Sequence, residues 1–322
     1  MAKHIDIDQR RRGREAQRPG EIPAPGWRDI LLRTRAGMNE NNLSLVAAGV
    51  AFYLLLSIFP ALAAMISIYG LIADPVEVER QMSSMMAIMP PQAADILLGQ
   101  MRQLASQPSG GLSVGVAVGV LLALWSASKG VKALIQGLNI AYDEREKRGF
   151  IKLNAVALLL TVGGIVVGML TLALVAVLPA LLSILKLPDT LSALLSLSRW
   201  PILLVVLAVS LAVVYRYAPS RDQPQWRWAS PGAAVAIGIW LLASIGFSVY
   251  VANFGSYSKT YGSVGAIVIL MTWFYLSSYV VLAGAKLNAE MEHQTGRDTT
   301  VGPERPLGER DAQVADTVGK RP

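Results

Sequence analysis

The chain has 322 residues, of which 53% are apolar and only 16% are charged, and its formal net charge is +7. This composition leaves too little polar material to solvate the surface of an ordinary globular protein, so the sequence indicates a membrane protein. Cysteine is absent, which excludes disulfide bonds, thiol catalysis and cysteine metal sites.

The first 44 residues are polar and rich in arginine. They lack the short basic start and apolar middle of a cleavable secretory signal, so the first apolar segment is expected to stay as an anchor. Residues 1–25 are predicted to form a disordered basic tail. A short helix after them is predicted to lie on an anionic leaflet, because it carries an apolar side and arginines. These residues are Trp27, Ile30, Leu31 and Met38, with Arg28, Arg33 and Arg35.

Six apolar runs are long enough to cross about 30 Å of hydrocarbon as helices. They lie near residues 45–72, 112–134, 155–178, 201–218, 232–253 and 264–286. The connection after the first run is predicted to contain amphipathic interfacial helices, because methionines recur there at helical spacing. They are Met82, Met85, Met86 and Met89. A methionine cluster can bind Cu(I), but without Cys or His beside it an adaptable apolar face is favoured.

The basic residues of the connections predict the orientation, because Lys and Arg next to spans stay on the cytoplasmic side. The N-terminal segment and the connections after the second and fourth runs are basic, the last two through Arg145, Lys147, Arg148 and Lys152, and through Arg216, Arg221 and Arg227. The long first connection has only Arg80 and Arg102, and the fifth has only Lys259. Both termini are therefore predicted to be cytoplasmic.

A polar stripe runs through the second apolar run and beyond it. Its members step by three or four residues, so they share one side of a helix: Ser126, Lys129, Lys132, Gln136, Asn139 and Asp143. A span that enters the hydrocarbon near Leu112 ends near Val131, which places both lysines close to the cytoplasmic boundary. Snorkelling would explain the lysines alone, whereas a water-filled cavity or a headgroup groove would also explain the two amides. Both alternatives stay open.

The fourth connection interleaves aromatic residues with arginines. Tyr215, Tyr217, Trp226 and Trp228 alternate there with Arg216, Arg221 and Arg227. Aromatic rings favour the headgroup level, and arginines can bind phosphates. An interfacial anchor is the favoured interpretation, and a lipid-headgroup site is the alternative.

Several enzyme classes lack their residues in this sequence. His4 and His293 are the only histidines, both in polar terminal segments, and cannot supply a multi-histidine metal site. The chain has neither a phosphate-binding Gly-x-x-x-x-Gly-Lys-Ser/Thr loop nor a Gly-x-Ser-x-Gly nucleophile elbow. No catalytic activity, cofactor or metal is therefore expected.

Three ordered motifs resemble the YihY/BrkB family of bacterial inner-membrane proteins. They are NNLSLVAAGVAFYLLLSIFPAL at 41–62, LWSASKGVKALIQGLNIAYDEREKRGF at 124–150 and YGSVGAIVILMTWFYLSSYVVLAGAKLNAE at 261–290. The resemblance covers about residues 25–292, and departs from the family at Lys286, where Glu is expected. It implies six membrane helices and a link to envelope integrity or serum resistance, with transport of a lipid or amphiphile. Family members have also carried the label ribonuclease BN, which the residues give no reason to accept.

The prediction is thus an all-α inner-membrane protein with a six-span domain at 26–292 and a disordered cytoplasmic tail at 293–322. Its expected partners are anionic membrane lipids and not nucleic acid, and a homo-oligomer is an open alternative. Transport of an anionic lipid-like substrate is the first functional hypothesis, a scaffold or regulator the second, and a ribonuclease the third. The candidate headgroup ligands are Ser126, Lys129, Lys132, Gln136, Asn139, Arg216, Arg221 and Arg227.

Overall fold

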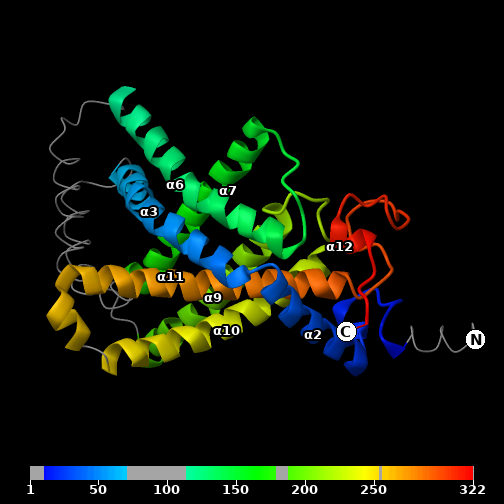
Figure 1. Cartoon of the computed structure of the whole chain (residues 1–322). Coiled ribbons are helices and arrows are strands. Elements are labelled where there is room, and N and C mark those ends of the chain that lie inside the picture. The colour runs from blue at the N-terminus through cyan, green and yellow to red at the C-terminus, as the bar shows by residue number, and fades with distance from the viewer. Residues whose placement is uncertain (1–10, 71–113, 179–187, 254–255, 322) are drawn as a thin grey trace, which may run out of the picture.

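The computed structural model describes residues 11–70, 114–178, 188–253 and 256–321 (Figure 1). Its long helices are α2 (Ala24–Glu40), α3 (Leu43–Gly70), α6 (Val114–Ala141), α7 (Phe150–Leu172), α9 (Asp189–Tyr217), α10 (Trp226–Asn253) and α11 (Ser256–Glu292). Shorter elements are η1 (Pro19–Glu21), the π-helical turn η2 (Ala173–Val177) and α12 (Gln313–Asp316). Within these ranges the pairing of Pro224 with Thr300 is an isolated bridge and all longer elements are helical.

Within the described residues, each predicted apolar run lies mainly on one long helix, and the third run continues from α7 into η2. Five helical segments are long and apolar enough to cross a membrane: Val118–Ala141, Phe150–Val175, Leu191–Tyr217, Trp226–Val251 and Ile267–Glu292. A sixth span results if α2 and the start of α3, which meet at a bend of 64°, count as one broken span. The predicted all-α fold with about six membrane helices is confirmed, while the side on which the termini lie stays a prediction.

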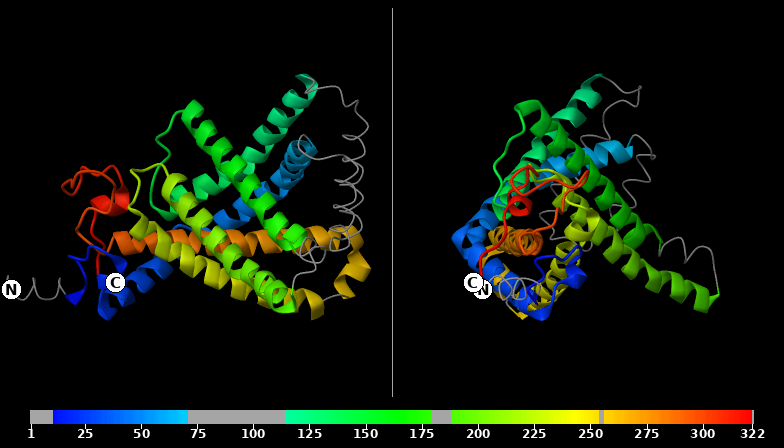
Figure 2. Two further views of the ribbon diagram at one scale, coloured as in Figure 1. Left: turned by 180° about the vertical axis from the view of Figure 1, so that it is seen from behind. Right: turned by 90° about the vertical axis from the view of Figure 1, so that its right-hand side faces the viewer.

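Helix α11 occupies the middle of the bundle and packs against α2, α3, α6 and α10 (Figures 1 and 2). Around it, α3 packs on α6, and α9 packs on α10 and α7. The backbones of α10 and α11 approach closely at Gly232 and Gly284. A Cβ atom on Gly232 would clash with the Gly284 carbonyl and the Asn288 side chain, so these positions require glycine for this crossing.

We call one end of the bundle the polar end; it comprises residues 11–40, 142–149, 218–225 and 293–321. The helix predicted to lie on a leaflet is present there as α2, but its apolar side packs mainly on protein. Ile30 is fully buried in a cluster with Trp228, Leu287 and Met291. Only Leu31 and Leu32 among its large apolar side chains are exposed. α2 therefore docks on the end of α11, and contact of its exposed side with a leaflet stays a prediction.

The terminal segments also differ from the predicted disordered tails. Residues 11–25 include η1 and bury Ala16 and Ile22. The segment 293–321 is held by hydrogen bonds to backbone carbonyls, which a polar composition does not reveal. The guanidinium of Arg310, for example, donates to the carbonyls of Gly296, Arg297, Arg305 and Ala315. Residues 1–10 and the predicted helices of the first connection, 73–111, lie outside the described residues.

Candidate functional site

The last turns of α11 carry a cluster of buried charges. Lys286 is 2% exposed, and its Nζ lies 2.6 Å from Asp143 Oδ2 and 3.3 Å from Glu290 Oε1. The other oxygen of Glu290 accepts a hydrogen bond from Arg33 Nε at 2.7 Å. A Cβ atom on Gly37 would clash with the Lys286 side chain, so this glycine lets α2 pass over the lysine. The lysine that replaces the expected Glu is thus neutralised by two carboxylates.

A second buried pair ties the fourth connection to α11. Arg221 binds the Glu292 carboxylate through both terminal nitrogens, at 3.1 and 2.7 Å, and both side chains are fully buried. Thr299 donates to the same carboxylate at 2.7 Å, and the Tyr142 ring lies 5.2 Å from the guanidinium. Burial alone would lower the pKa of Arg221, but the charge of Glu292 outweighs it and raises that pKa. Arg221 is therefore a structural residue rather than a free headgroup ligand.

The predicted stripe on α6 divides into two rows, because residues seven apart lie nearly on one line of a helix. The outer row is exposed and contains Lys129 and Gln136, while Asp143, the last residue of the predicted stripe, lies in the turn after α6 and is also exposed. Within the inner row, Lys132 stacks over the Trp125 ring at 4.6 Å, and Asn139 is 4% exposed. Ser126 is half-buried near the start of the stripe.

Asn139 has a structural role, because both ends of its side-chain amide form hydrogen bonds within the protein. Its carbonyl oxygen accepts a hydrogen bond from the Ser220 N–H at 2.8 Å, and its amide nitrogen donates to Glu146 Oε2 at 3.0 Å. These contacts join α6 to the connection between α6 and α7 and to the connection between α9 and α10. Asn139 therefore does not share the exposed row with Lys129 and Gln136.

Both lysines lie well before the end of α6. The apolar part of α6 continues to Ala141, and Ile140 is still exposed next to the helix end. Lys129 precedes Ala141 by twelve residues, which is about 18 Å at the rise of an α-helix, and Lys132 by about 14 Å. The candidate span Val118–Ala141 is longer than the roughly 20 residues that cross the hydrocarbon, so the expected boundary near Val131 stays a prediction. Around Lys129 the exposed face is apolar, with Leu121, Leu122 and Trp125.

The three arginines of the fourth connection do not converge. Arg216 is buried at the end of α9, with its guanidinium 4.5 Å from the Trp226 ring and 5.4 Å from the Tyr217 ring. Its Nε and Nη1 have no hydrogen-bond partner among the described residues. Arg227 is exposed at the start of α10, whereas Arg221 is paired with Glu292.

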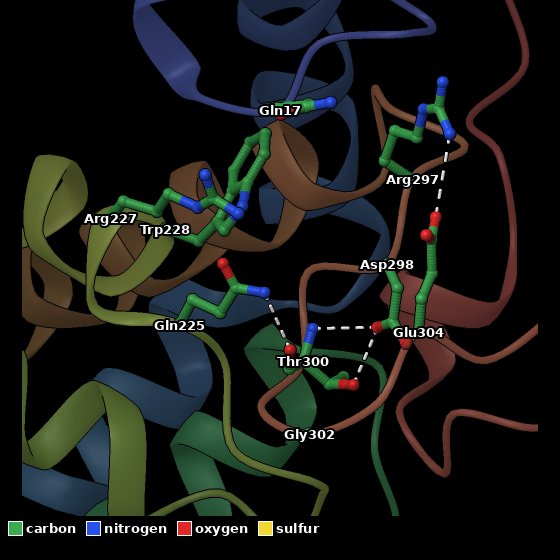
Figure 3. A pocket seen from close by; sticks show the side chains of 9 residues that line it. All are labelled: Gln17, Gln225, Arg227, Trp228, Arg297, Asp298, Thr300, Gly302 and Glu304. Atoms are coloured by element: carbon green, nitrogen blue, oxygen red, sulfur yellow. Dashed lines mark hydrogen bonds and ion pairs between the residues drawn. The ribbon is translucent and has the colours of Figure 1, made fainter.

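A pocket of about 200 Å³ lies at the polar end (Figure 3). Three separate segments form it: the N-terminal segment, the start of α10 and the segment after α11. Its lining residues are Gln17, Gln225, Arg227, Trp228, Arg297, Asp298, Thr300, Gly302 and Glu304.

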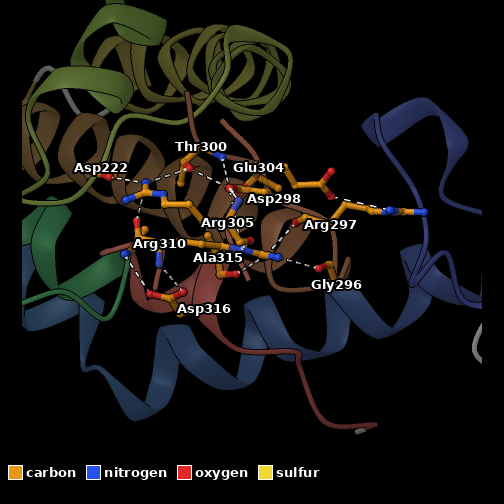
Figure 4. A network of polar contacts seen from close by, with 12 residues as sticks. Asp222, Gly296, Arg297, Asp298, Thr300, Glu304, Arg305, Arg310, Ala315 and Asp316 are labelled. Carbon is orange, nitrogen blue, oxygen red and sulfur yellow. Dashed lines mark hydrogen bonds and ion pairs between the residues drawn. The ribbon is translucent and has the colours of Figure 1, made fainter. Parts of the chain in front are cut away.

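The segment after α11 is fixed by a polar network (Figure 4). Arg305 pairs with Asp222, and the Asp298 carboxylate accepts bonds from Thr300 and from the Arg305 N–H. Burial would raise the pKa of Asp298, but these hydrogen bonds outweigh it and lower that pKa. The network holds one wall of the pocket in place.

Sequence reasoning missed the charge cluster of α11. The four-residue spacing of Lys286 and Glu290 is a local signal for an ion pair on a helix. Asp143, Arg33 and Arg221 come from distant parts of the chain, so no local pattern could assign them. Among the described residues no three His, Asp or Glu side chains are arranged to hold a metal ion.

Comparison with known proteins identifies one family whose sequence model matches this chain. The sequence model of the family described as Virulence factor BrkB matches residues 34–308. YfkH of Bacillus subtilis, which is named as ribonuclease-like, is 32% identical over 251 residues, covering 76% of this chain and 88% of that protein. A UPF0761 membrane protein of Idiomarina loihiensis is 30% identical over 164 residues, covering 50% of this chain and 56% of the relative. A UPF0761 membrane protein of Stenotrophomonas maltophilia is 38% identical over 97 residues, which cover 30% of this chain and 22% of the relative. No solved structure matches the chain.

Proposed function

The chain belongs to the BrkB family of membrane proteins, as its three motifs predicted, and from this premise we propose that it handles an anionic lipid or a similar amphiphile. In this proposal the protein lies in the bacterial inner membrane, moves the substrate between leaflets or holds its headgroup, and thereby supports envelope integrity. The described helices supply the membrane domain for this role.

The exposed lysine of α6 is the observation that carries the proposal. Lys129 lies about 18 Å before the end of α6, within the candidate span Val118–Ala141, and no ion pair binds it among the described residues. Elsewhere in those residues, deeply buried charges such as Lys286 and Arg221 have carboxylate partners. A cation inside a span is costly unless it is neutralised or hydrated, so Lys129 favours an anionic partner from outside the chain.

Two neighbours extend the polar surface for a headgroup. Gln136 lies two turns further along the same exposed row and can both donate and accept hydrogen bonds. Lys132 adds a second cation, held by the Trp125 ring beside that row. The surrounding apolar face suits acyl chains, and the polar row suits a charged head, which is the combination that an amphiphile needs.

Removing the two lysines tests this proposal. We expect the Lys129→Met/Lys132→Met variant to insert normally but to bind phosphatidylglycerol more weakly by roughly tenfold or more, because each of the two cations contributes on the order of 1 kcal/mol. It should also fail to rescue an envelope-sensitive null strain. Arg145→Met/Lys152→Met is the matched control, because it removes two exposed cations from another part of the chain. Unchanged lipid binding together with full rescue by the lysine variant would refute the proposal.

A scaffold or regulator is the second candidate, favoured by the folded terminal segments that join several connections at the polar end. It predicts full function of the lysine variant and dependence on exposed residues of the terminal segments. Transport predicts the reverse, so the same rescue experiment separates the two.

A ribonuclease is the least favoured candidate. The purified protein is expected not to cleave transfer RNA, with or without added zinc or magnesium, because water activation needs a metal cluster or a positioned base. Cleavage that copurifies with the chain and disappears after a point substitution in it would overturn this expectation.

The proposed orientation has its own test. Cysteines introduced as Ser84→Cys and Ser256→Cys should react with an impermeant thiol reagent added outside intact cells. Gly149→Cys and Glu309→Cys lie at exposed positions of the polar end and should be protected. Labelling of this second pair would reverse the predicted orientation.

A further inference from the structure

The pocket at the polar end has the donors of an anion site. We propose that it binds the phosphate group of a small phosphomonoester or of a lipid headgroup. This site is separate from the α6 lysines, so it goes beyond the proposed function. The two sources share one chemistry, a phosphate with a small polar substituent.

Two arginines supply the positive charge. Arg227 is exposed at the pocket and has no ion pair among the described residues. Arg297 is paired with Glu304 at 3.7 Å, but both side chains are more than half exposed, so this pair is weak and a phosphate can compete for the guanidinium. In Figure 3 Arg227 and Arg297 lie on opposite sides of the pocket, and the Arg297 guanidinium faces Glu304.

Trp228 provides an independent sign of a missing partner. The residue is 1% exposed and lines the pocket, and its indole Nε1 has no hydrogen-bond partner among the described residues. Buried indole N–H groups usually have an acceptor. Arg227 and Trp228 also lie in the first turn of α10, where the helix dipole favours an anion.

The acidic residues of the pocket do not cancel this preference. Both oxygens of Asp298 accept hydrogen bonds from Thr300 and the Arg305 N–H, and Arg310 lies 3.9 Å from one of them. The charge of Asp298 is thus already compensated within the segment. Glu304 is exposed and can turn away when a stronger acceptor approaches Arg297.

The volume of the pocket limits the size of the ligand. About 200 Å³ is below the range of roughly 300 to 1,000 Å³ that holds drug-sized molecules, so the pocket suits a glycerol phosphate more than a nucleotide. Its walls come from the start of α10 and from the segment after α11. An occupant would therefore bridge these two parts of the polar end.

The first arm of the test uses the full chain in nanodiscs of phosphatidylcholine. Glycerol 3-phosphate and inorganic phosphate are titrated and binding is followed by calorimetry. We expect Arg227→Gln and Arg297→Gln each to weaken binding about tenfold or more, because each removes a charge-assisted hydrogen bond. Arg145→Gln is the matched control, and Lys129→Met/Lys132→Met should also leave this binding unchanged.

The second arm uses discs that contain phosphatidylglycerol, with native mass spectrometry of the lipid that stays on the protein. If the protein binds glycerol 3-phosphate and Arg227→Gln abolishes this binding, the ligand is a phosphomonoester. If the protein binds neither soluble phosphate but retains phosphatidylglycerol, and Arg227→Gln loses the lipid, the ligand is a lipid headgroup. Thermal unfolding of each variant verifies that it is folded, and Arg297→Gln replaces Arg227→Gln if the latter is not. The proposal is overturned if both ligands are unaffected by both arginine substitutions or if neither ligand binds.

Discussion

The end of α11 and the exposed face of α6 both place charge in an apolar environment, but they treat it differently. Lys286 lies 2.6 Å from Asp143, in the turn after α6, and Arg221 lies 2.7 Å from Glu292 of α11. Lys129 projects from an apolar helix face without an ion pair among the described residues. The two regions therefore differ in whether a carboxylate of the chain pairs with the cation. A matched charge stabilises the fold, whereas an unmatched charge points to a ligand.

Breaking the Arg221–Glu292 pair should have the largest effect. We expect Arg221→Met to lower the free energy of unfolding by about 3 to 5 kcal/mol, because Glu292 then stays buried without its cation. Thermal unfolding of the purified protein in detergent measures this. The double variant Arg221→Met/Glu292→Met should regain most of the loss, since it leaves no buried charge. Equal losses in the single and double variants would show that packing, not charge pairing, explains the effect.

Substitution of Lys286 should lower the free energy of unfolding by a smaller amount, which depends on the charge of the new side chain. Lys286→Gln is expected to cost about 1.5 to 3 kcal/mol, because Glu290 keeps its bond to Arg33. Lys286→Glu should cost more, since a third carboxylate would join Asp143 and Glu290. The same unfolding assay ranks the two variants. A Lys286→Glu variant as stable as wild type would mean that the cluster rearranges around the residue expected in the family.

The sequence could predict the helices and the polar stripe, because length and periodicity are local properties. It could not separate Asn139 from Gln136. These residues are three positions apart on α6, and only the approach of Ser220 to one side of the helix buries one and leaves the other exposed. The Arg221–Glu292 pair and the folded segment after α11 depend likewise on contacts between distant residues. The membrane boundary near Val131 stays a prediction, because α6 continues to Ala141 and is longer than the hydrocarbon is thick.

Asn139 and Gln136 allow a buried and an exposed amide side chain to be compared within one helix. Asn139→Leu should destabilise the protein by about 1 to 2 kcal/mol, because the buried Ser220 N–H loses its acceptor. Gln136→Leu should change stability by less than about 0.5 kcal/mol, as is usual for a surface position, while weakening lipid binding. Unfolding and lipid-binding assays on both variants separate the roles. Reversed results would place the ligand surface on the inner row.

The smallest effect concerns pH at the polar end. Burial would raise the pKa of Glu146, but hydrogen bonds from Arg148 and Asn139 outweigh it and lower that pKa to about 2. A carboxylate whose pKa is lower in the folded protein stabilises the fold above its unfolded value, near 4.5, and loses this contribution as the pH falls toward 2.

We therefore compare wild type with Glu146→Gln, which keeps the shape of the side chain and removes its charge. At pH 7 wild type should be more stable by up to about 1 kcal/mol, since Arg148 and Glu146 form a solvent-screened pair. The difference in melting temperature should shrink steadily from pH 5 to pH 3, while Gln136→Leu, which lacks a titrating group, should show a constant difference from wild type. A difference for Glu146→Gln that stays constant with pH would show that the Arg148 ion pair does not contribute to folding, and that Glu146 acts only as a neutral acceptor for Asn139.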